Sequence, residues 1–555
     1  MTEKTAPAGE LSRFLARLAD KHSDADAVFS LRLAETALDA LEREPPPVAA
    51  LAVVGPTQTG KSTVVNIIAG GRYVETSPLA AHTQRSSVLA LNTSVEVLPA
   101  TYPVDPTLAP RTVESDAPAC LIWDTPDFDS NASRVYRQQV ARVCARVDLV
   151  VLVLSKEKYA DQSVWTFLEA LAPLEVPIVI CLNKCEGQVG EGNAGERSDA
   201  DVLVPAIQRR LEEHLQLGGG IPVLILPRVP GGELESFLAR PDVQRFREDV
   251  FNRLHCRSED ARRAGLERLM RTYCPTWIAP VEQELVCQRE WNTLVSAAVE
   301  SFRDRYRTEY IEHARHHDVA RKAILGLLEL LEIPALSGPI SQTRRVLTWP
   351  FRKLSGAFGG GGEPARDQEL QVIDTALEHC LLSLRSEVLT RRHPWWRALA
   401  QELVGCEPGM RRRFRDAVDD YRRDFQPRID RLSEELYRQL ERNPVTLNTL
   451  RATRLGADAG GIVLAIKTGT LGIYDALFAP AVISLTSYLT ESAVGQYLRT
   501  VIARLKREQT ERMSGVLQET IEQPLRTLRP QGEGLFGVTE AELSRAMELM
   551  RELSP

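Results

Sequence analysis

The feature that most constrains this chain is the segment GPTQTGKST, residues 55–63, which lies between an apolar run and a helical pattern. The run VAALAVV precedes it and STVVNIIAG overlaps its end, so the sequence predicts a buried strand, a tight loop and a helix in that order. Gly55 and Gly60 allow the loop backbone to turn its N–H groups inward, and the helix directs its positive N-terminal end to the same point. Such a loop binds nucleotide phosphates; the alternative is a glycine-rich turn that arises by chance.

The residues of this loop have separate expected roles. The ammonium of Lys61 is expected to reach the β- and γ-phosphates, and the hydroxyl of Ser62 is expected to bind Mg²⁺. The predicted nucleotide contacts within the loop are Gly55, Gln58, Thr59, Gly60, Lys61, Ser62 and Thr63.

Short apolar runs alternate with helical patterns between residue 48 and about residue 230. The runs are VAALAVVG, SVLALN, ACLIWD, DLVVLVL, PIVICLN and PVLIL. Runs that are apolar on both faces are typical of buried, mainly parallel strands with helices on two sides. The sequence therefore predicts a three-layer α/β domain.

Asp124 ends the apolar run ACLIW, after the phosphate loop in the chain. A carboxylate at this place can hold a water bound to Mg²⁺ opposite the loop. The alternative is an aspartate that caps a turn at the end of a strand. Asp124 is therefore predicted to bind the metal through water.

A second polar segment, Asn183-Lys184-Cys185-Glu186, follows the run PIVICL at the position of a guanine-recognition motif NKxD. The carboxylate of such a motif accepts hydrogen bonds from guanine N1–H and N2–H₂, a pattern that adenine does not offer. Glu186 stands in place of the usual aspartate, so adenine stays open as the base. Asn183, Lys184 and Glu186 are predicted to bind the base; a polar strand end that binds nothing is the alternative. A further base-contacting loop is expected around residues 227–229.

With these landmarks the chain resembles the dynamin-like and Era-like P-loop GTPases of the TRAFAC class, and more specifically the bacterial dynamin family. The resemblance covers residues 50–230 and the helical texture that follows them. It implies GTP as substrate and Mg²⁺ as cofactor. In small GTPases the segment at Asp124 has the pattern DxxG, so Asp127 stands where glycine is usual. Phe128 stands where those proteins carry the glutamine that positions water.

Two further residues gain a role from the resemblance. Thr83 lies in a polar loop just before a predicted strand, and it corresponds to the threonine that gives Mg²⁺ a second protein ligand. Gln58 lies where dynamin-like proteins often carry a polar residue that positions the attacking water. The alternative for each is a solvated loop residue. The predicted catalytic residues are Lys61, Gln58 and Thr83, and the predicted metal ligands are Ser62, Thr83 and Asp124.

After Phe251 the sequence changes to long, charged helical patterns that are typical of bundles or coiled coils. The expected division is N-terminal helices packing with the helical region over 1–47, a GTPase domain over 48–255 and a stalk-like all-α region over 256–555. The exceptions in the last region are a loop over 337–367, with interleaved cations and aromatics, and an apolar segment over 457–489. Each is either a peripheral membrane anchor or a part packed on the helices, and the apolar segment is too interrupted for a single membrane-spanning helix.

Composition limits the partners and the compartment. The net charge of −7 gives no overall positive field for nucleic acid, so no nucleic-acid partner is expected. Scattered cysteines and the lack of an export signal indicate a cytoplasmic protein, with the inner membrane as a possible peripheral site. The resemblance implies a homo-oligomer.

These observations lead to one expected function and one alternative. The first is Mg²⁺-dependent GTP binding and hydrolysis in which the nucleotide controls assembly, membrane association or both. The alternative is a nucleotide-gated scaffold that binds GTP or ATP with negligible hydrolysis.

Overall fold

The computed structural model describes residues 5–42, 48–75, 86–94, 111–128, 133–185, 199–215, 220–229, 234–312, 368–442, 495–532 and 534–553. The chain forms two compact units, residues 1–285 with 533–555 (unit 1) and residues 286–532 (unit 2). Four predictions lie outside the described residues: the roles of Thr83 and Glu186, the loop 337–367 and the apolar segment 457–489.

Unit 1 contains a sheet whose strands, among the described residues, run in the order β3-β2-β4-β1-β5-β6-β7. The β2–β4 pair is antiparallel and the other neighbours are parallel. Every run that the sequence predicts as a strand forms one, whereas the short, exposed edge strand β3 was not predicted. The bounds are β1 Ala50–Val54, β2 Ser87–Leu91, β3 Arg111–Val113, β4 Cys120–Asp124, β5 Leu149–Leu154, β6 Ile178–Cys185 and β7 Val223–Pro227.

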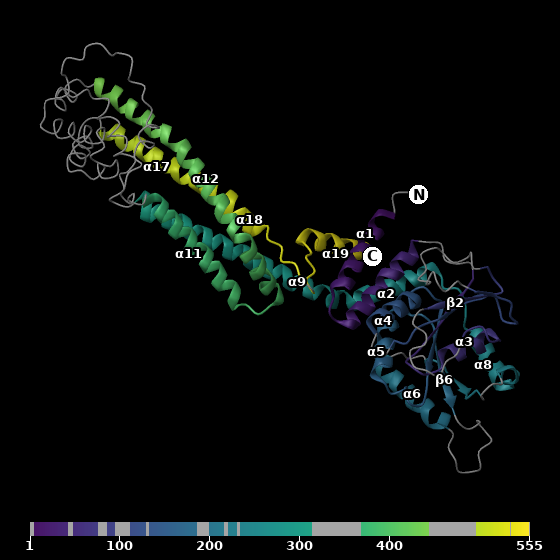
Figure 1. The fold of residues 1–555 in the computed structure, drawn as a ribbon. Coiled ribbons are helices and arrows are strands. Elements are labelled where there is room, and N and C mark those ends of the chain that lie inside the picture. The colour runs from purple at the N-terminus through teal and green to yellow at the C-terminus, as the bar shows by residue number, and fades with distance from the viewer. Residues whose placement is uncertain are drawn as a thin grey trace. The chain divides into compact units, whose positions relative to one another are not determined.

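Helices cover both faces of this sheet (Figure 1). Alternate residues of β1 enter different clusters, because successive side chains of a strand point to opposite faces. Ala50, Ala52 and Val54 pack in the cluster with α4, α5 and α6, whereas Leu51 and Val53 pack in the cluster with α3 and α8. This is the predicted three-layer α/β fold. The bounds are α3 Lys61–Ala69, α4 Ser133–Cys144, α5 Gln162–Leu171, η2 Ala172–Leu174, α6 Asp199–Leu215, α7 Leu234–Leu238 and α8 Pro241–Phe251.

Helices from both chain ends also belong to unit 1. They are α1 (Thr5–Lys21), α2 (Ala25–Leu41), α19 (Glu540–Leu553) and the first part of α9 (Glu259–Tyr306). The Arg17 guanidinium of α1 pairs with Glu542 of α19 at 3.1 Å, and Trp277 Nε1 of α9 donates to Ser30 Oγ of α2 at 2.8 Å. Helices α1 and α2 and the first part of α9 share one hydrophobic cluster with strands β1 and β5.

The buried carboxylate of Glu284 fixes the segment that leads to α19. It accepts hydrogen bonds from the backbone N–H groups of Phe536, at 3.0 Å, and Gly537, at 3.2 Å. Gly537 has a φ of +64°, a backbone conformation that suits glycine. These contacts hold the C-terminal segment on α9 within unit 1.

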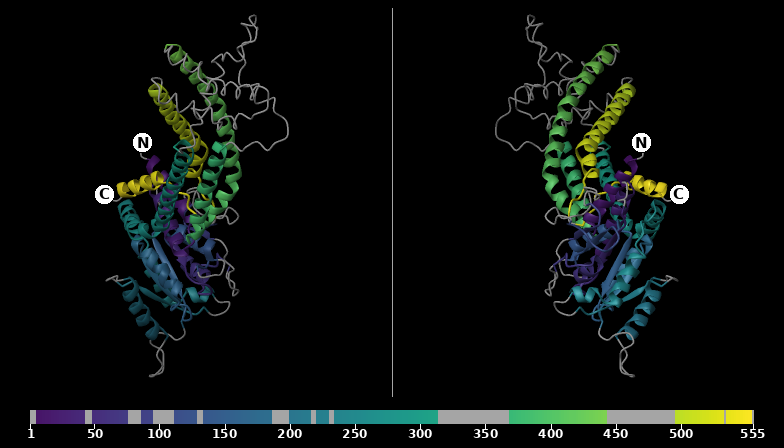
Figure 2. Two further views of the ribbon diagram at one scale, coloured as in Figure 1. Left: turned by 90° about the vertical axis from the view of Figure 1, so that its left-hand side faces the viewer. Right: turned by 90° about the vertical axis from the view of Figure 1, so that its right-hand side faces the viewer.

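Unit 2 is a set of long helices, which agrees with the predicted all-α region. The later part of α9 continues into the π-helix η3, and α12 and α17 lie side by side (Figures 1 and 2). No helix in the described parts of the chain has both the length and the apolar character to cross a membrane. The bounds are η3 Arg307–Ile311, α11 Gln368–Thr390, α12 Pro394–Glu441, α17 Gly495–Leu517, η6 Gln518–Glu522 and α18 Gln523–Arg526.

A buried polar network joins four of these helices. The Glu369 carboxylate of α11 accepts from Tyr306 Oη of α9 at 2.9 Å and from Gln509 Nε2 of α17 at 3.0 Å. Tyr421 Oη of α12 lies 3.4 Å from the same oxygen. Because a buried polar group needs its partners, this network restricts how the helices can align.

We expect the substitution Glu284→Ala to loosen the C-terminal segment, because the backbone N–H groups of Phe536 and Gly537 lose their charged acceptor. A hydrogen bond to a charged group contributes about 1.5–3 kcal/mol. Amide hydrogen exchange at Phe536 and Gly537 measures it directly and should become at least about tenfold faster. The exposed Glu282→Ala is the matched control. Unchanged exchange in the Glu284 variant would show that the carboxylate does not hold this segment.

Candidate functional site

The loop between β1 and α3 is closely packed at its two predicted glycines. Gly60 has a φ of +90°, and a Cβ at this position would lie 2.5 Å from Asn183 Nδ2. A Cβ at Gly55 would lie 2.5 Å from the carbonyl oxygen of Val153. A residue with a Cβ atom would therefore clash with its neighbours at both positions. At Gly60 the left-handed backbone conformation excludes such a residue as well.

Inside the loop, polar side chains bind backbone carbonyls. The buried Thr59 hydroxyl donates to the carbonyl of Pro56 at 2.9 Å, and Lys61 Nζ donates to the same oxygen at 3.1 Å. Lys61 also forms an ion pair with the Asp127 carboxylate. The Lys61 side chain is only 5% exposed, so its ammonium depends on these partners.

Ser62 and Asp124 meet at the N-terminus of α3. Parallel pairing of β1 with β4 sets Asp124 beside Val53, two residues before the loop, and Ser62 Oγ donates to Asp124 Oδ2 at 2.9 Å. Asp124 is 1% exposed. Burial raises the pKa of this carboxyl to about 6, an effect that Ser62 and Lys61 reduce and Asp127 adds to.

The surroundings of Asp124 fit a magnesium ion. Within the described residues, its second oxygen, Oδ1, is buried and has no hydrogen-bond partner. A buried carboxylate oxygen without a donor favours a cation or its bound water, and a hydroxyl and a carboxylate are ligand types that Mg²⁺ accepts. Ser62 and Asp124 are therefore suited to hold the ion, Asp124 through water.

The predicted base-recognition residues contact the phosphate loop from the end of β6. Asn183 Nδ2 donates to the Thr59 carbonyl at 2.8 Å, and Lys184 Nζ donates to the Gln58 carbonyl at 2.6 Å. Lys184 has a φ of +64°, which turns the chain sharply at this point. Pro227 at the end of β7 pairs with Cys185 at the end of β6. The predicted base-contacting loop, residues 227–229, therefore starts at the same edge of the sheet as Asn183 and Lys184.

The structure thus brings together the phosphate loop, Asp124, Asn183 and Lys184. The side chain of Gln58 is exposed, with its backbone at a φ of +65°, and Thr63 is partly exposed. Thr83 and Glu186 lie outside the described residues, and their roles stay predictions.

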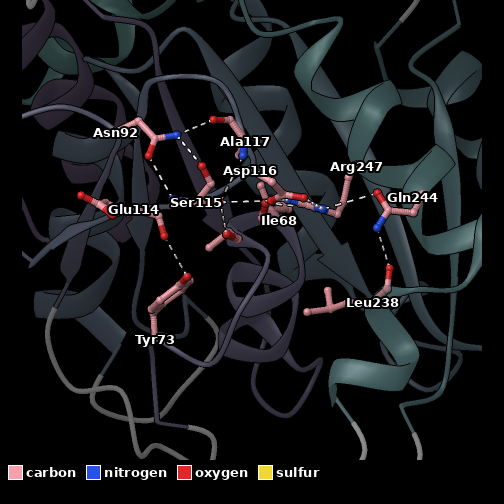
Figure 3. Close-up of polar contacts among 11 residues, drawn as sticks. Ile68, Tyr73, Asn92, Glu114, Ser115, Asp116, Ala117, Leu238, Gln244 and Arg247 are labelled. Carbon is pink, nitrogen blue, oxygen red and sulfur yellow. Dashed lines mark hydrogen bonds and ion pairs between the residues drawn. The ribbon is translucent and has the colours of Figure 1, made fainter.

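Sequence reasoning missed the residues that hold the far end of α3 (Figure 3). Ser115 Oγ donates to the Ala69 carbonyl at 2.6 Å, and Arg247 Nε lies 3.4 Å from the carbonyl of Ile68. Asp116 accepts from Arg247 Nη1 at 2.9 Å, and this contact lowers the pKa of the Asp116 carboxyl. Because the last carbonyls of a helix lack intrahelical partners, these contacts anchor the helix that carries Lys61 and Ser62.

Asn66 of α3 was also missed, since a lone asparagine in a helical pattern gives no sequence signal. Its Oδ1 accepts from the N–H groups of Tyr73 and Val74, each at 2.8 Å, and its Nδ2 donates to the Val74 carbonyl at 2.8 Å. Tyr73 and Val74, which follow α3, are therefore held on the helix.

We expect Asp124→Asn to stabilise the protein at neutral pH when magnesium and nucleotide are left out. The pKa of Asp124 is raised to about 6 in the fold, above its usual 3.8, so its contribution opposes folding above pH 6 and disappears below pH 4. A shift of two pKa units corresponds to roughly 2–3 kcal/mol in the free energy of unfolding.

Urea unfolding of the wild type and the Asp124 variant at pH 7.5 and pH 4 measures this difference. The variant should be the more stable at pH 7.5 and similar to the wild type at pH 4, while the exposed-site control Glu213→Gln should change neither value. A variant that is less stable at both pH values would contradict the assignment.

No curated protein matches this chain. Solved structures do match it at low identity. A structure of an oligomerised bacterial dynamin pair, described as sensing and tethering membranes, aligns over 100% of this chain and 96% of its own, at 12% identity and a TM-score of 0.39. The LeoA bacterial dynamin GTPase from ETEC aligns over 100% and 93%, at 14% identity and a TM-score of 0.26.

Era from Aquifex aeolicus, with GDP and AlF4⁻ bound, aligns over 38% of this chain at 16% identity and a TM-score of 0.26. This alignment spans 58% of the Era chain. All three TM-scores lie below 0.5, so these likenesses carry no conclusion about shared overall architecture or partners.

The family model is the informative match. The model described as 50S ribosome-binding GTPase matches residues 50–184, which run from β1 through the phosphate loop and Asp124 to Asn183-Lys184. The matched segment contains the elements that the structure brings to one edge of the sheet. Residues 50–184 are therefore similar to a P-loop GTPase domain.

Proposed function

We propose that this protein binds GTP with Mg²⁺ and hydrolyses it, and that the bound nucleotide controls assembly of copies of the chain and their association with a membrane surface. One observation carries the proposal: Lys61, Ser62 and Asp124 meet at the loop between β1 and α3, while Asn183 and Lys184 contact the same loop. A phosphate site and a base site that share a loop suit one nucleotide.

Phosphate binding is proposed to rest on the loop backbone and Lys61. The left-handed conformations at Gln58 and Gly60 turn the backbone within the loop. Helix α3 begins at Lys61, and the first N–H groups of a helix have no partner within the helix. The Lys61 ammonium would bind the β- and γ-phosphates, and Thr59 would keep the loop closed through its bond to Pro56.

Ser62 and, through water, Asp124 would hold Mg²⁺, with Thr83 proposed as a further ligand. When bound, the ion neutralises negative charge on the β- and γ-phosphates. The support for this assignment is the buried, unpartnered Oδ1 of Asp124 beside the Ser62 hydroxyl.

Base binding is proposed to depend on Asn183, Lys184 and Glu186. Asn183 and Lys184 bind the backbone of the phosphate loop, which fixes the end of β6 close to where the nucleotide would lie. Glu186 would accept the guanine N1–H and N2–H₂ groups, as its position in the motif suggests.

The attacking water would need a positioning group. Phe128, which occupies the place of the usual glutamine, has a buried ring and cannot donate or accept a hydrogen bond. The exposed Gln58 side chain is the proposed substitute. Turnover by a single copy is therefore expected to be slow, in line with GTPases that need a partner to complete the site.

We expect Lys61→Ala to lower the affinity for GTP by about a hundredfold and to abolish turnover, because the phosphates lose a buried charged partner. Phosphate release and competition of GTP and ATP for one fluorescent analogue measure both effects. The exposed Lys21→Ala is the control. Full GTP affinity in the Lys61 variant would refute the site, and equal competition by ATP would refute the guanine preference.

A nucleotide-gated scaffold is the second candidate, favoured by Asp127 and Phe128 in the segment after β4. It would bind GTP and release almost no phosphate at any protein concentration.

Assembly control makes a different prediction from the scaffold. We expect the GTPase rate per molecule to rise with protein concentration and on anionic vesicles, because neighbouring copies would complete the site. Trp349 and Phe351 are aromatic residues of the loop 337–367 that is proposed as a membrane anchor. The double substitution Trp349→Ala/Phe351→Ala should remove vesicle binding in flotation while leaving the rate in solution unchanged. A constant rate at all concentrations would contradict assembly control, and no flotation of the wild type in any nucleotide state would contradict membrane association.

A cytoplasmic setting is proposed on the cysteines. The nine cysteines all lie in the described residues and form no disulfide there. Cys120, Cys144, Cys181 and Cys185 are buried in unit 1, which suits a reducing compartment. The domain limits 48–255 and 256–555 also remain proposals.

A further inference from the structure

The ion pair between Lys61 and Asp127 lies where a triphosphate is proposed to bind. The Lys61 side chain is 5% exposed and that of Asp127 is 10% exposed, so the contact is almost closed to solvent. An ammonium has three N–H donors, and Lys61 uses donors on Asp127 and on the Pro56 carbonyl. The lysine that should bind phosphate therefore already has an anionic partner.

We propose that Asp127 distinguishes GTP from GDP, because its carboxylate and the terminal phosphate compete for the ammonium of Lys61. This inference rests on the proposed function of the site. A diphosphate occupies only part of the contact that a triphosphate makes with such a lysine, and Asp127 can keep its place beside it. A terminal phosphate brings a second anion to the same ammonium and repels the carboxylate.

Among the residues that the structure describes, Lys61 is the charged partner of the Asp127 carboxylate. The Asp124 carboxylate, on the other hand, repels Asp127. Lys184 is directed to the Gln58 carbonyl. A metal ion on the Ser62 and Asp124 side would offset the charge of Asp124 and the phosphates. Once Lys61 turns to the terminal phosphate, Asp127 has to move away.

The backbone limits where this movement can begin. Asp124 is fixed by pairing with Val53 on one side and Ser87 on the other. The Thr125 hydroxyl donates to the Val53 carbonyl at 2.9 Å, so this residue is held as well. A displacement of Asp127 therefore starts after Thr125, in the segment Pro126–Phe128.

Phe128 connects this segment to the N-terminal helices of unit 1. Its ring is stacked on the Phe167 ring of α5, with centroids 4.6 Å apart and an angle of 5° between the planes. The Phe167 ring also packs on the Phe29 ring of α2, with centroids 5.6 Å apart. Ser30, which follows Phe29 in α2, accepts a hydrogen bond from Trp277 of α9. A shift of Asp127 disturbs this aromatic contact, so α2 and α9 would respond to the third phosphate.

The test is Asp127→Asn, which keeps the shape and removes the charge. In the presence of Mg²⁺, the full-length variant should bind a fluorescent non-hydrolysable GTP analogue about tenfold more tightly than the wild type, the size expected for one partly screened charge contact. Its affinity for GDP should change by less than about threefold. Asp127→Gly removes the side chain. It should also raise the affinity for the GTP analogue relative to that for GDP.

A second readout separates competition from a merely structural role. In the wild type, hydrogen exchange at Phe29 and Ser30 should differ between the GTP analogue and GDP, and the Asp127→Asn variant should lose this difference. Glu259→Gln is the control, because it breaks an exposed ion pair with Arg263 and should leave this difference unchanged.

The outcomes are distinct. If the wild type binds both nucleotides and neither Asp127 variant changes the ratio of their affinities, the inference is wrong and the proposed function stands. The same holds if both variants weaken both nucleotides alike. If the wild type binds neither nucleotide, the proposed function fails and the inference fails with it.

Discussion

The buried ammonium of Lys61 is the constraint on which the site depends. A nearly solvent-free charge needs an anionic partner, and this structure supplies Asp127 from the segment after β4. The contact requires α3 to begin at Lys61 directly after Gly60, and it requires β4 to end beside β1. Parallel pairing, the glycine conformation and the anchored far end of α3 all serve this geometry.

Much of this arrangement was predictable because it is local. The sequence GPTQTGKST lies between two unambiguous patterns, and the apolar runs around β1, β4, β5 and β6 are too regular to be loops. Their carboxyl ends share one edge of a parallel sheet, so the proximity of Asp124 and Asn183 to the loop followed from their order. The short strand β3 gave no such signal because it has three residues and an exposed edge.

The rest could not be predicted because it depends on contacts distant in sequence. Asp127 was noted only as a replacement for glycine, and nothing local indicated that its carboxylate would pair with Lys61. Arg247 reaches the end of α3 across 179 residues, and Glu284 holds Phe536 across 252 residues. The predicted boundary near residue 255 rests on a change in texture and stays a proposal. The contacts of α9 with Ser30 and Glu169 join residues too distant in sequence to leave a local signal.

The central claim is that the loop holding Lys61 binds a guanine triphosphate with magnesium. Calorimetric titration of GTP into the purified full-length chain, with and without Mg²⁺, tests it most directly. We expect saturable binding of one GTP per chain that depends on Mg²⁺ and weakens sharply in Lys61→Ala. Heat that is absent with Mg²⁺, or an isotherm that is unchanged when the ammonium is removed, would contradict it.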